Sequence, residues 1–437
     1  MIQMVKAIRK YWKTHIVRSD FQGIIFCSLI WIVIGIFNVY SSGMIVKGST
    51  APAFYQTNYF KHIVFLLISA LAGIFFYKID YQHFRSSKYT EVAIKGFMVF
   101  VAVALLGVLK FAEPVNGARR WIQLGSLISV QPSEFAKLGS ILWAAHWIDL
   151  QHRKQRYLSW METFTYKGSI GWLNNIARNG RKVPAVALWL PFLYAALTLV
   201  EPDTGTALLI AAIPVMLMII SGLSRKSALI MIYGFLAMIP IAAIGIMNSA
   251  YRKERILAWW DPWGYAQSLS YQSVQSMIAI GSGGIFGQGL AQGSAKYHYL
   301  PEAHTDFAFA VWSQETGLIG SLILIIVVAM FIYYGLNIAL KAKDYYGKLL
   351  AAGITLIIGG QAVFNMIMVS GMIPVTGVPL PFVSYGGSSL LTNVIALAIL
   401  FNVAHRSEMA RKKIGVSGHI PSLREETRSR FAPAHIE

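Results

Sequence analysis

The chain has 437 residues, of which 56% are hydrophobic and only 13% are charged. A soluble protein of this length usually has about a quarter of its residues charged, so the composition excludes an ordinary soluble enzyme. The net charge of +19 lies in short basic islands between apolar stretches, which argues against a nucleic acid partner. Cys27 is the single cysteine, so no intramolecular disulfide can form.

Apolar stretches of about 20 residues recur from one end of the chain to the other. Such stretches predict transmembrane helices, because only a structure that pairs its backbone groups internally can cross the hydrocarbon core. The predicted fold class is therefore an all-α polytopic membrane protein. We expect ten spans, near residues 23–42, 61–78, 92–111, 132–150, 184–200, 204–222, 227–247, 307–338, 349–372 and 383–404.

The distribution of basic residues predicts the orientation of these spans. With a cytoplasmic N-terminus, 28 of the 38 Lys and Arg residues fall in the inner segments. Short basic loops stay in the cytoplasm, so both termini are expected there. The predicted domains are an N-terminal segment (1–22), a transmembrane domain (23–405) and a disordered basic tail (406–437). The first apolar run indicates an anchor rather than a cleaved signal peptide.

Two connecting segments are unusually long. The inner loop 149–183 mixes basic and aromatic residues, which is typical of a segment lying on the membrane surface, although a cytoplasmic partner site is an alternative. The outer loop 248–306, between the seventh and eighth spans, predicts a helix near 270–280 and then a glycine-rich run. The glycines follow no strand and lack G-x-G-x-x-G spacing, so a nucleotide site is not expected. We expect flexible re-entrant packing of this run against the membrane surface.

The fourth, sixth, eighth and tenth spans all begin at the outer surface, and their starts are polar or proline-rich. They read "QPSEFAK" (131–137), "EPDTGTAL" (201–208), "EAHTDFAF" (302–309) and "VPLPFVSYGGSS" (378–389). Helix N-termini carry unpaired N–H groups and a positive partial charge, so they favour anions. Four such ends on one side predict a site for a phosphate-bearing lipid.

Ordinary capping explains part of this pattern. Proline suits first turns and threonine suits N-caps, which accounts for Pro132, Pro202, Thr204 and Thr305. Capping accounts less well for the acids and the lysine at the same boundary.

Glu134 and Lys137 are three residues apart and therefore share one helix face. Lys137 lies about one turn inside the span, where a charge needs a partner or a wet cavity. The spacing is compatible with an ion pair between Glu134 and Lys137 and equally with contact between these residues and a ligand. Upstream, Arg119 and Arg120 suit a pyrophosphate through forked hydrogen bonds, or they anchor the chain at the interface beside Trp121.

Asp306 stands at the start of the eighth span. A helix N-terminus stabilises a carboxylate, whereas partial burial destabilises it. A partly desolvated carboxylate at an outer cavity suits a general base that takes a proton from a sugar hydroxyl. By position alone, capping and catalysis explain Asp306 equally well. Glu302 and His304 are weaker candidates for orientation or metal contact.

Five stretches, in order, carry a resemblance to a known family. They are "NGARRWIQLGSLISVQPSEFAK", "EPDTGTALLI", "YQSVQSMIAIGSGGIFGQGL", "YLPEAHTDFAFAVWSQETGLIG" and "GMIPVTGVPLPFVSYGGSS". With "NVYSS" (38–42), they resemble the SEDS family, the shape, elongation, division and sporulation proteins exemplified by FtsW and RodA. The resemblance covers roughly residues 20 to 405.

The resemblance implies ten transmembrane helices and a peptidoglycan glycosyltransferase. Such an enzyme polymerises lipid II at the outer face of the bacterial cytoplasmic membrane, with inversion and with undecaprenyl pyrophosphate as leaving group. Asp306, in the "HTD" motif, matches the family's catalytic residue, and Glu134 and Lys137 match its important pair in "QPSEFAK". In this scheme Arg119, Arg120 and Lys137 are the candidates to hold the pyrophosphate.

The resemblance also implies partners and a cofactor. The expected partners are lipid II, the nascent glycan strand, a class B penicillin-binding protein, other divisome or elongasome proteins, and membrane lipids. A divalent cation, Mg or Mn, is expected from the resemblance alone, since the sequence shows no ligand set for a metal.

One stretch departs from the family pattern. "DPWGYAQSLSYQSVQS" (261–276) is shorter than its counterpart in many relatives, so Asp261 is given no role. "PEAHTDF" favours the division branch and its sporulation relatives. A lipid II flippase, which should place charges at mid-membrane depth, and a non-catalytic scaffold, which would not need Asp306, are the alternatives.

Overall fold

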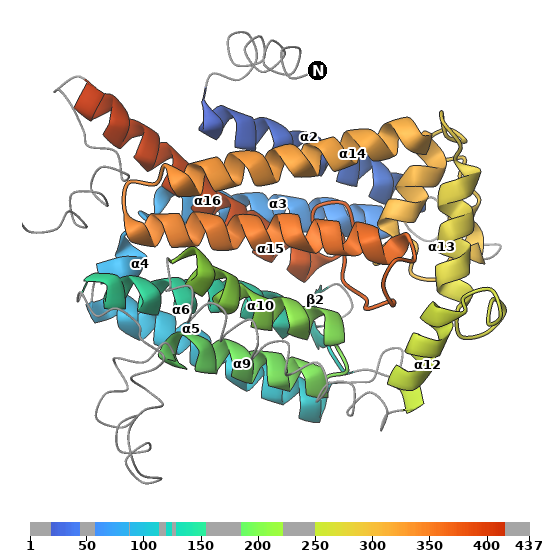
Figure 1. Cartoon of the computed structure of the whole chain (residues 1–437), viewed down its shortest axis with the longest axis horizontal. Coiled ribbons are helices and arrows are strands. Elements are labelled where there is room, and N and C mark those ends of the chain that lie inside the picture. The colour runs from blue at the N-terminus through green and yellow to red at the C-terminus, as the bar shows by residue number, and fades with distance from the viewer. Residues whose placement is uncertain are drawn as a thin grey trace, which may run out of the picture.

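The structure is a computed structural model that describes residues 19–43, 57–86, 88–112, 119–124, 128–153, 185–221 and 250–415 (Figure 1). It is mostly helical. In chain order the elements are α2 (Asp20–Gly43), α3 (Asn58–Lys78), α4 (His83–Ser86), α5 (Lys88–Phe111), β1 (Ile122–Leu124), β2 (Ile128–Val130), α6 (Pro132–Arg153), α9 (Ala185–Val200), α10 (Thr204–Ile220), α12 (Ala250–Trp260), α13 (Tyr271–Ser282), the π-helix η2 (Ala295–Tyr299), α14 (Ala308–Leu340), α15 (Tyr345–Val369) and α16 (Gly387–Gly415).

The predicted spans coincide with helices wherever the structure describes them. Among the described residues, six helices are long and apolar enough to cross a membrane, namely α2, α3, α5, α14, α15 and α16, and α9 and α10 are shorter apolar helices. The seventh predicted span, 227–247, lies outside the described residues, as do 1–18 and most of the loop 149–183. The total of ten spans therefore stays a prediction.

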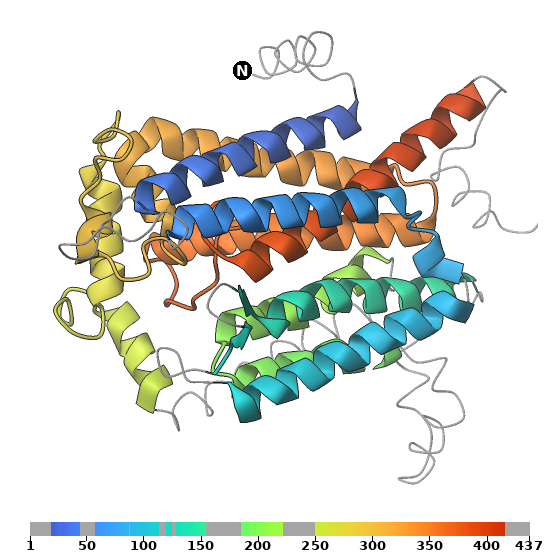
Figure 2. The same cartoon turned by 180° about the vertical axis from the view of Figure 1, so that it is seen from behind.

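The long helices form two groups that run side by side (Figures 1 and 2). One group contains α2, α3, α14, α15 and α16, and the other contains α5, α6, α9 and α10. The groups meet where α15 and α16 pack on α6 and where α15 packs on α10. Helices α12 and α13 lie across one end of the long helices, and β1 and β2 form a small antiparallel hairpin near the same end.

Helix α6 carries Glu134, Lys137 and Asp149 within a predicted span, and the packing explains how these charges are tolerated. Glu134, Lys137 and Asp149 are all nearly inaccessible, as is most of the helix. Neighbours α5, α9, α10, α15 and α16 surround it. Ionised side chains are costly in contact with lipid, so they gather on the helix that the others shield.

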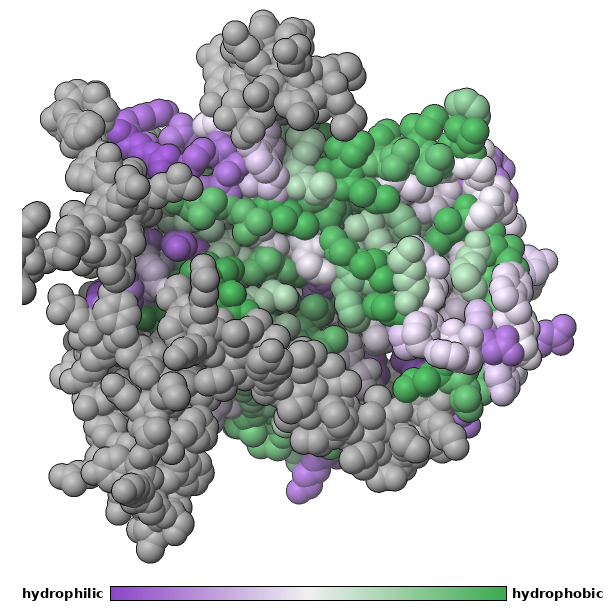
Figure 3. All heavy atoms as spheres, viewed as in Figure 1, coloured by the Kyte–Doolittle hydropathy of each residue, from purple (hydrophilic) through white to green (hydrophobic). Residues whose placement is uncertain are grey.

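The surface agrees with a membrane-embedded body. Figure 3 shows hydrophobic residues along the flank formed by α14 and α15, while hydrophilic residues gather towards the two ends. The exposed aliphatic side chains of α14 include Leu322, Ile323 and Ile326. Exposed aliphatic side chains in a continuous stripe are what a lipid-facing helix presents.

Helix α14 is broken where the sequence predicts an uninterrupted span. Gly317 has φ 66° and ψ −161° inside the helix. The glycine-rich run fills the break, because Leu318 N–H donates to the Gly284 carbonyl (2.9 Å) and Gln288 N–H donates to the Gln314 carbonyl (3.0 Å). The expectation that this run packs flexibly on the membrane surface is corrected: it docks on the helix and satisfies the backbone groups that the break frees.

Other boundaries also differ from the prediction. α13 confirms the helix expected near 270–280, whereas α12, in the same outer loop, was not predicted. α6 runs to Arg153, into the predicted inner loop. α16 continues to Gly415, so residues 406–415 of the predicted disordered tail are helical. Packing explains that extension, because Arg406 forms a 2.8 Å ion pair with Asp80.

Candidate active site

Three of the four polar helix starts are joined by hydrogen bonds. The Ser388 hydroxyl of α16 accepts from the Gln131 main-chain N–H (3.0 Å) and donates to the Ser129 carbonyl (3.0 Å), just before α6. The Gln131 side-chain amide donates to Asp203 Oδ2 (3.2 Å) at the start of α10. The starts of α6, α10 and α16 thus converge, as their shared side of the membrane predicts.

The fourth start, that of α14, is fixed from α15. The Asn365 side-chain amide donates to the main-chain carbonyl of Asp306 (2.8 Å) and to that of Val378 (2.7 Å). Gly377, which directly precedes Val378, adopts a φ of 76°. A Cβ atom at Gly377 would lie 3.3 Å from Asp306 Oδ2 and 3.6 Å from Arg120 Nη1. The carboxylate and the guanidinium therefore both lie beside a position that has no side chain.

The Asp306 carboxylate is not used for capping. The N-cap of α14 is Phe307, and no side chain caps this end. Asp306 is partly buried, and its carboxylate forms no hydrogen bond or ion pair with another described residue. Of the two explanations that position allowed, the geometry favours a carboxylate left available for chemistry.

The surroundings of Asp306 raise its pKa from 3.8 to about 7. Burial is the largest cause, and the negative charges of Glu302 and Asp203 add to it. The positive charges of Arg120 and Arg255 lower the pKa and offset part of this effect. A carboxyl group with a pKa near neutrality can both accept and release a proton at physiological pH.

The paired arginines of the sequence point to different places. Arg120 donates to the carbonyls of Glu201 (3.3 Å) and Pro202, which places it beside Asp306. Arg119 is exposed and donates to the Leu109 carbonyl (3.3 Å) at the end of α5. The structure therefore brings one of the two guanidiniums to the site.

Glu134 and Lys137 form a buried ion pair of 2.8 Å, as their spacing allowed. Lys137 Nζ also donates to Gln361 Oε1 (2.6 Å) on α15. Gln361 lies one helical turn from Asn365, which holds Asp306. Two residues one turn apart on α15 thus contact the Asp306 main chain and a lysine inside the helix bundle, respectively.

Glu302 and His304 belong to the turn before α14. Glu302 accepts a 2.7 Å hydrogen bond from the Thr305 hydroxyl, and its main-chain carbonyl accepts from Phe307 N–H (3.2 Å). The His304 carbonyl accepts from Tyr385 N–H (2.8 Å) and its ring lies 5.9 Å from the Tyr385 ring. Both residues shape the turn that carries Asp306.

The threonine and proline caps expected from the sequence are only partly present. Pro132 is the first residue of α6, as expected. The cap of α10, however, is Asp203, whose Oδ1 accepts from Thr206 N–H (3.1 Å), and Thr204 is the first helical residue. Aspartate competes well for an N-cap because its side chain accepts from the orphan N–H groups.

Several residues at the site were not predicted from the sequence. Asp203 and Glu201 lie in "EPDTGTAL", where acids at the start of an apolar span could have marked them as candidates. Glu201 is fully buried with neither carboxylate oxygen hydrogen-bonded among the described residues. Burial and the charge of Asp203 raise the pKa of Glu201 from 4.5 to about 8. Arg255 of α12 donates to the Val375 carbonyl (2.7 Å), two residues from Gly377, and no local pattern marked it.

The described residues contain no group of three or more His, Cys, Asp or Glu side chains placed to hold a metal ion. Asp306, Asp203 and Glu302 influence one another electrostatically but do not form such a group. The side chains that the structure describes therefore do not by themselves form a resident metal site.

Comparison with known proteins agrees with this architecture. The model of the cell cycle protein family FtsW/RodA/SpoVE matches residues 21–409. A probable peptidoglycan glycosyltransferase FtsW of Trichlorobacter lovleyi is 34% identical over 383 residues, covering 86% of this chain and 91% of its own length. Stage V sporulation protein E of Bacillus subtilis is 33% identical over 390 residues, covering 88% and 96%.

Solved structures share the fold. A chain from a peptidoglycan synthase complex, whose structure concerns the coordination of polymerization and crosslinking, aligns with a TM-score of 0.66 at 23% identity and covers 88% of this chain and 97% of its own. The rod shape determining protein RodA of Thermus thermophilus aligns with a TM-score of 0.58 at 23% identity, covering 88% and 96%. The similarity in fold and the apolar helices make this chain a multi-pass membrane protein.

Proposed function

The chain belongs to the FtsW/RodA/SpoVE family of cell cycle proteins, and we propose that it is a peptidoglycan glycosyltransferase that polymerises lipid II. The observation that carries the proposal is the Asp306 carboxylate. It is unpaired among the described residues, has a pKa raised to about 7, and lies with Arg120 beside Gly377 where four helix starts meet. A base beside cations is what transfer of a glycosyl group from a pyrophosphate requires.

In the proposed reaction, Asp306 takes the proton from the 4-hydroxyl of the N-acetylglucosamine at the acceptor end. The oxygen attacks C1 of the donor N-acetylmuramic acid from the face opposite the pyrophosphate, so the configuration inverts. The C1–O bond breaks, and its electron pair leaves with undecaprenyl pyrophosphate. Asp306 then releases its proton to the outer solution, because it is partly exposed.

The cations of the site are proposed to stabilise the leaving group. Arg120 and Arg255 both act on the Asp306 carboxyl, so an anion bound next to Asp306 would feel both charges. Lys137 lies deeper and is neutralised by Glu134, so we assign this pair to shaping the site through Gln361. Arg119 would reach a pyrophosphate only by leaving Leu109.

A divalent cation, Mg or Mn, belongs to the proposal as a companion of the substrate. Mg²⁺ commonly binds through one or two carboxylates together with substrate phosphates rather than in an all-protein cage. That mode is compatible with a chain whose described residues offer no cluster of three ligands. The cation would supply charge neutralisation to the pyrophosphate.

The membrane arrangement is proposed from the charge pattern and the helix starts. Ten spans with both termini in the cytoplasm of a bacterial cell place Asp306 at the outer face, where lipid II is polymerised. The proposed protein partner is a class B penicillin-binding protein, with other divisome or elongasome proteins around it. A role in division or sporulation is favoured over elongation, since "PEAHTDF" resembles the division branch and the two relatives are named FtsW and stage V sporulation protein E.

The opposite end of the bundle supports surface chemistry over transport. Asp149 is buried there and pairs with Arg85 (3.0 Å) and Arg153 (2.9 Å). Tyr81 donates to Asp344 (2.6 Å) in the same cluster. These bonds tie α4 and α6 to the loop before α15, whereas a lipid II flippase would need a passage through this end.

The test is polymerisation of purified lipid II by the purified protein, with and without its penicillin-binding protein and with Mg²⁺ or Mn²⁺. We expect long glycan strands from the wild type, none from Asp306→Ala, and wild-type product from Asp261→Asn, which changes an exposed acid of the same outer loop. Equal product from wild type and Asp306→Ala would remove the catalytic role. No product from any protein, partner included, would leave the flippase or scaffold functions.

A further inference from the structure

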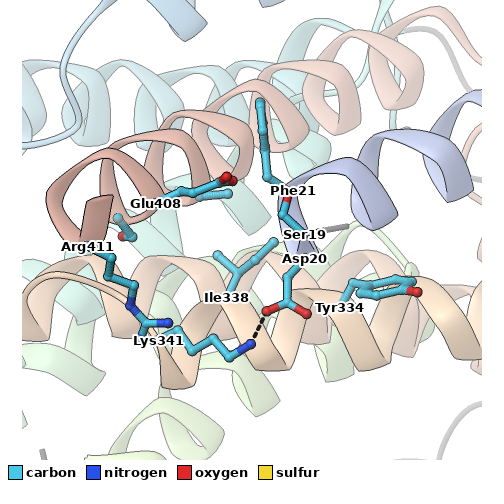
Figure 4. A pocket seen from close by; sticks show the side chains of 10 residues that line it. Ser19, Asp20, Phe21, Tyr334, Ile338, Lys341, Glu408 and Arg411 are labelled. Carbon is cyan, nitrogen blue, oxygen red and sulfur yellow. Dashed lines mark hydrogen bonds and ion pairs between the residues drawn. The ribbon is translucent and has the colours of Figure 1, made fainter. Parts of the chain in front are cut away.

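A pocket of about 230 Å³ lies between the start of α2, the end of α14 and the last turns of α16 (Figure 4). Helix α14 begins next to Asp306 and is 33 residues long. At 1.5 Å per residue, the pocket is about 50 Å from the candidate active site and therefore at the other membrane face. Nothing in the proposed reaction uses it.

Four ionisable side chains line this pocket, two acidic and two basic: Asp20, Glu408, Lys341 and Arg411. Asp20 pairs with Lys341. Glu408 contacts Lys412 at 3.1 Å, but Lys412 is 70% exposed, so this contact is weak. Arg411 forms no ion pair or hydrogen bond within the part of the chain that the structure describes, and Figure 4 shows it extending from α16 towards Lys341.

Apolar side chains lie in the pocket and elsewhere on the helices that form it. Phe21 and Ile338 line it beside the charges. On the outer sides of the same helices, Leu29 of α2 is 57% exposed and Leu340 of α14 is 65% exposed. A charged recess at the end of lipid-facing helices matches the division of a phospholipid into a polar head and apolar chains.

We propose that this pocket binds the headgroup of a zwitterionic phospholipid that carries a phosphate diester and a primary ammonium, with its acyl chains along α2 and α14. The phosphate pairs with Arg411 and Lys341, and the ammonium pairs with Glu408 and Asp20. Because the four side chains sum to zero charge, a headgroup with both signs can satisfy them all, whereas an anionic headgroup would meet two acids. The volume equals that of about eight waters at ~30 Å³ each, which accommodates a phosphate and a two-carbon amine.

The experiment is native mass spectrometry of the full chain in detergent, titrated with phosphatidylethanolamine, phosphatidylglycerol or phosphatidylcholine of identical acyl chains. We expect one tightly held phosphatidylethanolamine, preferred about tenfold over the other two. Phosphatidylcholine is the informative comparison, because it has the same net charge but no ammonium N–H to donate.

Substitutions inside and outside the pocket test whether the lipid binds there. Arg411→Gln and Glu408→Gln should each weaken phosphatidylethanolamine binding about tenfold. Lys348→Gln removes one charge from the start of α15, outside the pocket, and should bind like the wild type. Soluble glycerophosphoethanolamine should not displace the lipid, since it lacks the chains.

Four outcomes would overturn the proposal. Equal binding of the three lipids, or unchanged binding by Arg411→Gln and Glu408→Gln, would show that the pocket does not recognise the headgroup. A preference for phosphatidylglycerol would make it an anionic-lipid site. Full displacement by glycerophosphoethanolamine would make it a site for a soluble phosphate ester.

Discussion

Asn365 holds the main chain of Asp306 through a 2.8 Å hydrogen bond from its side-chain amide to the Asp306 carbonyl. The same amide group donates to Val378 (2.7 Å), so one side chain joins α15 to both segments that border the carboxylate. Asn365→Ala should therefore lower the polymerisation rate about 10- to 100-fold, because a displaced base loses its alignment with the acceptor hydroxyl.

The measurement is the rate of glycan synthesis at saturating lipid II. Asn393→Ala is the matched control, since this asparagine of α16 donates within its own helix, to Ser389 (3.2 Å). It should keep most of the activity. A folded Asn365→Ala protein with the wild-type rate would show that Asp306 is positioned without this contact.

Activity should rise with pH through about 7. Asp306 must be ionised to act as a base, and its pKa is raised to about 7, chiefly by burial. Below that pH the carboxyl carries its proton, so the rate should fall about tenfold for each further pH unit. A pH–rate profile of the wild type in the presence of its partner measures this. A profile that is flat from pH 5 to 8 would contradict the assignment of Asp306 as the base.

Removing a nearby cation should move that profile to higher pH. Arg120 and Arg255 both lower the pKa of Asp306, so Arg120→Ala and Arg255→Ala should each raise its pKa and the midpoint of the profile. Arg119→Ala is the control, because Arg119 is exposed and donates to Leu109 instead. Midpoints that shift equally in all three variants would reflect overall charge rather than these two contacts.

The long apolar runs, the helix starts at Pro132 and near Asp306, and the pairing of Glu134 with Lys137 could all be predicted from the sequence. Each depends on residues close together in the chain, where periodicity and spacing are informative. Arg120 and Arg119 could not be separated, because the contact that distinguishes Arg120 is with Glu201 and Pro202, far along the chain, whereas Arg119 contacts Leu109. Asn365 was missed for the same reason: its partner Asp306 is 59 residues away.

Glu201 and Asp203 are separated by one residue, but replacing each by its amide should change the stability of the protein in different directions. Glu201 has a pKa raised from 4.5 to about 8, mainly by burial, so it is largely protonated at pH 7. Between about pH 4.5 and pH 8 the Glu201 carboxyl binds a proton more strongly in the folded than in the unfolded state. The free energy of unfolding therefore falls as the pH rises through this range. Glu201→Gln removes this loss and should be more stable than the wild type at pH 8, with little difference at pH 4.5.

Asp203 accepts hydrogen bonds from Thr206 N–H (3.1 Å) and from the Gln131 amide (3.2 Å). Asp203→Asn places an amide donor where the carboxylate accepted, so it should lower stability by about 1–2 kcal/mol. Thermal unfolding of both variants across this pH range gives the comparison. A Glu201→Gln protein that loses stability at pH 8 would mean that the carboxylate is ionised and needed.

The break in α14 should depend on two glycines. Gly317 and Gly287 have φ values of 66° and 82°, and a Cβ at Gly317 would lie 2.4 Å from the Gly287 nitrogen. Gly317→Ala combines an unfavourable backbone conformation with a clash against backbone, so we expect a loss of about 2 kcal/mol or more. Gly360→Ala, in α15, is the control because a Cβ there meets no atom within 4 Å.

The same substitution should also reduce activity, because residues 308–316 connect the break directly to Asp306. A displaced glycine run would shift this short segment and with it the carboxylate. Polymerisation rates and thermal unfolding of Gly317→Ala and Gly360→Ala therefore test the link between the outer loop and the site. If Gly317→Ala lost stability but kept its full rate, the position of Asp306 would depend on Asn365 and the turn at Glu302 alone.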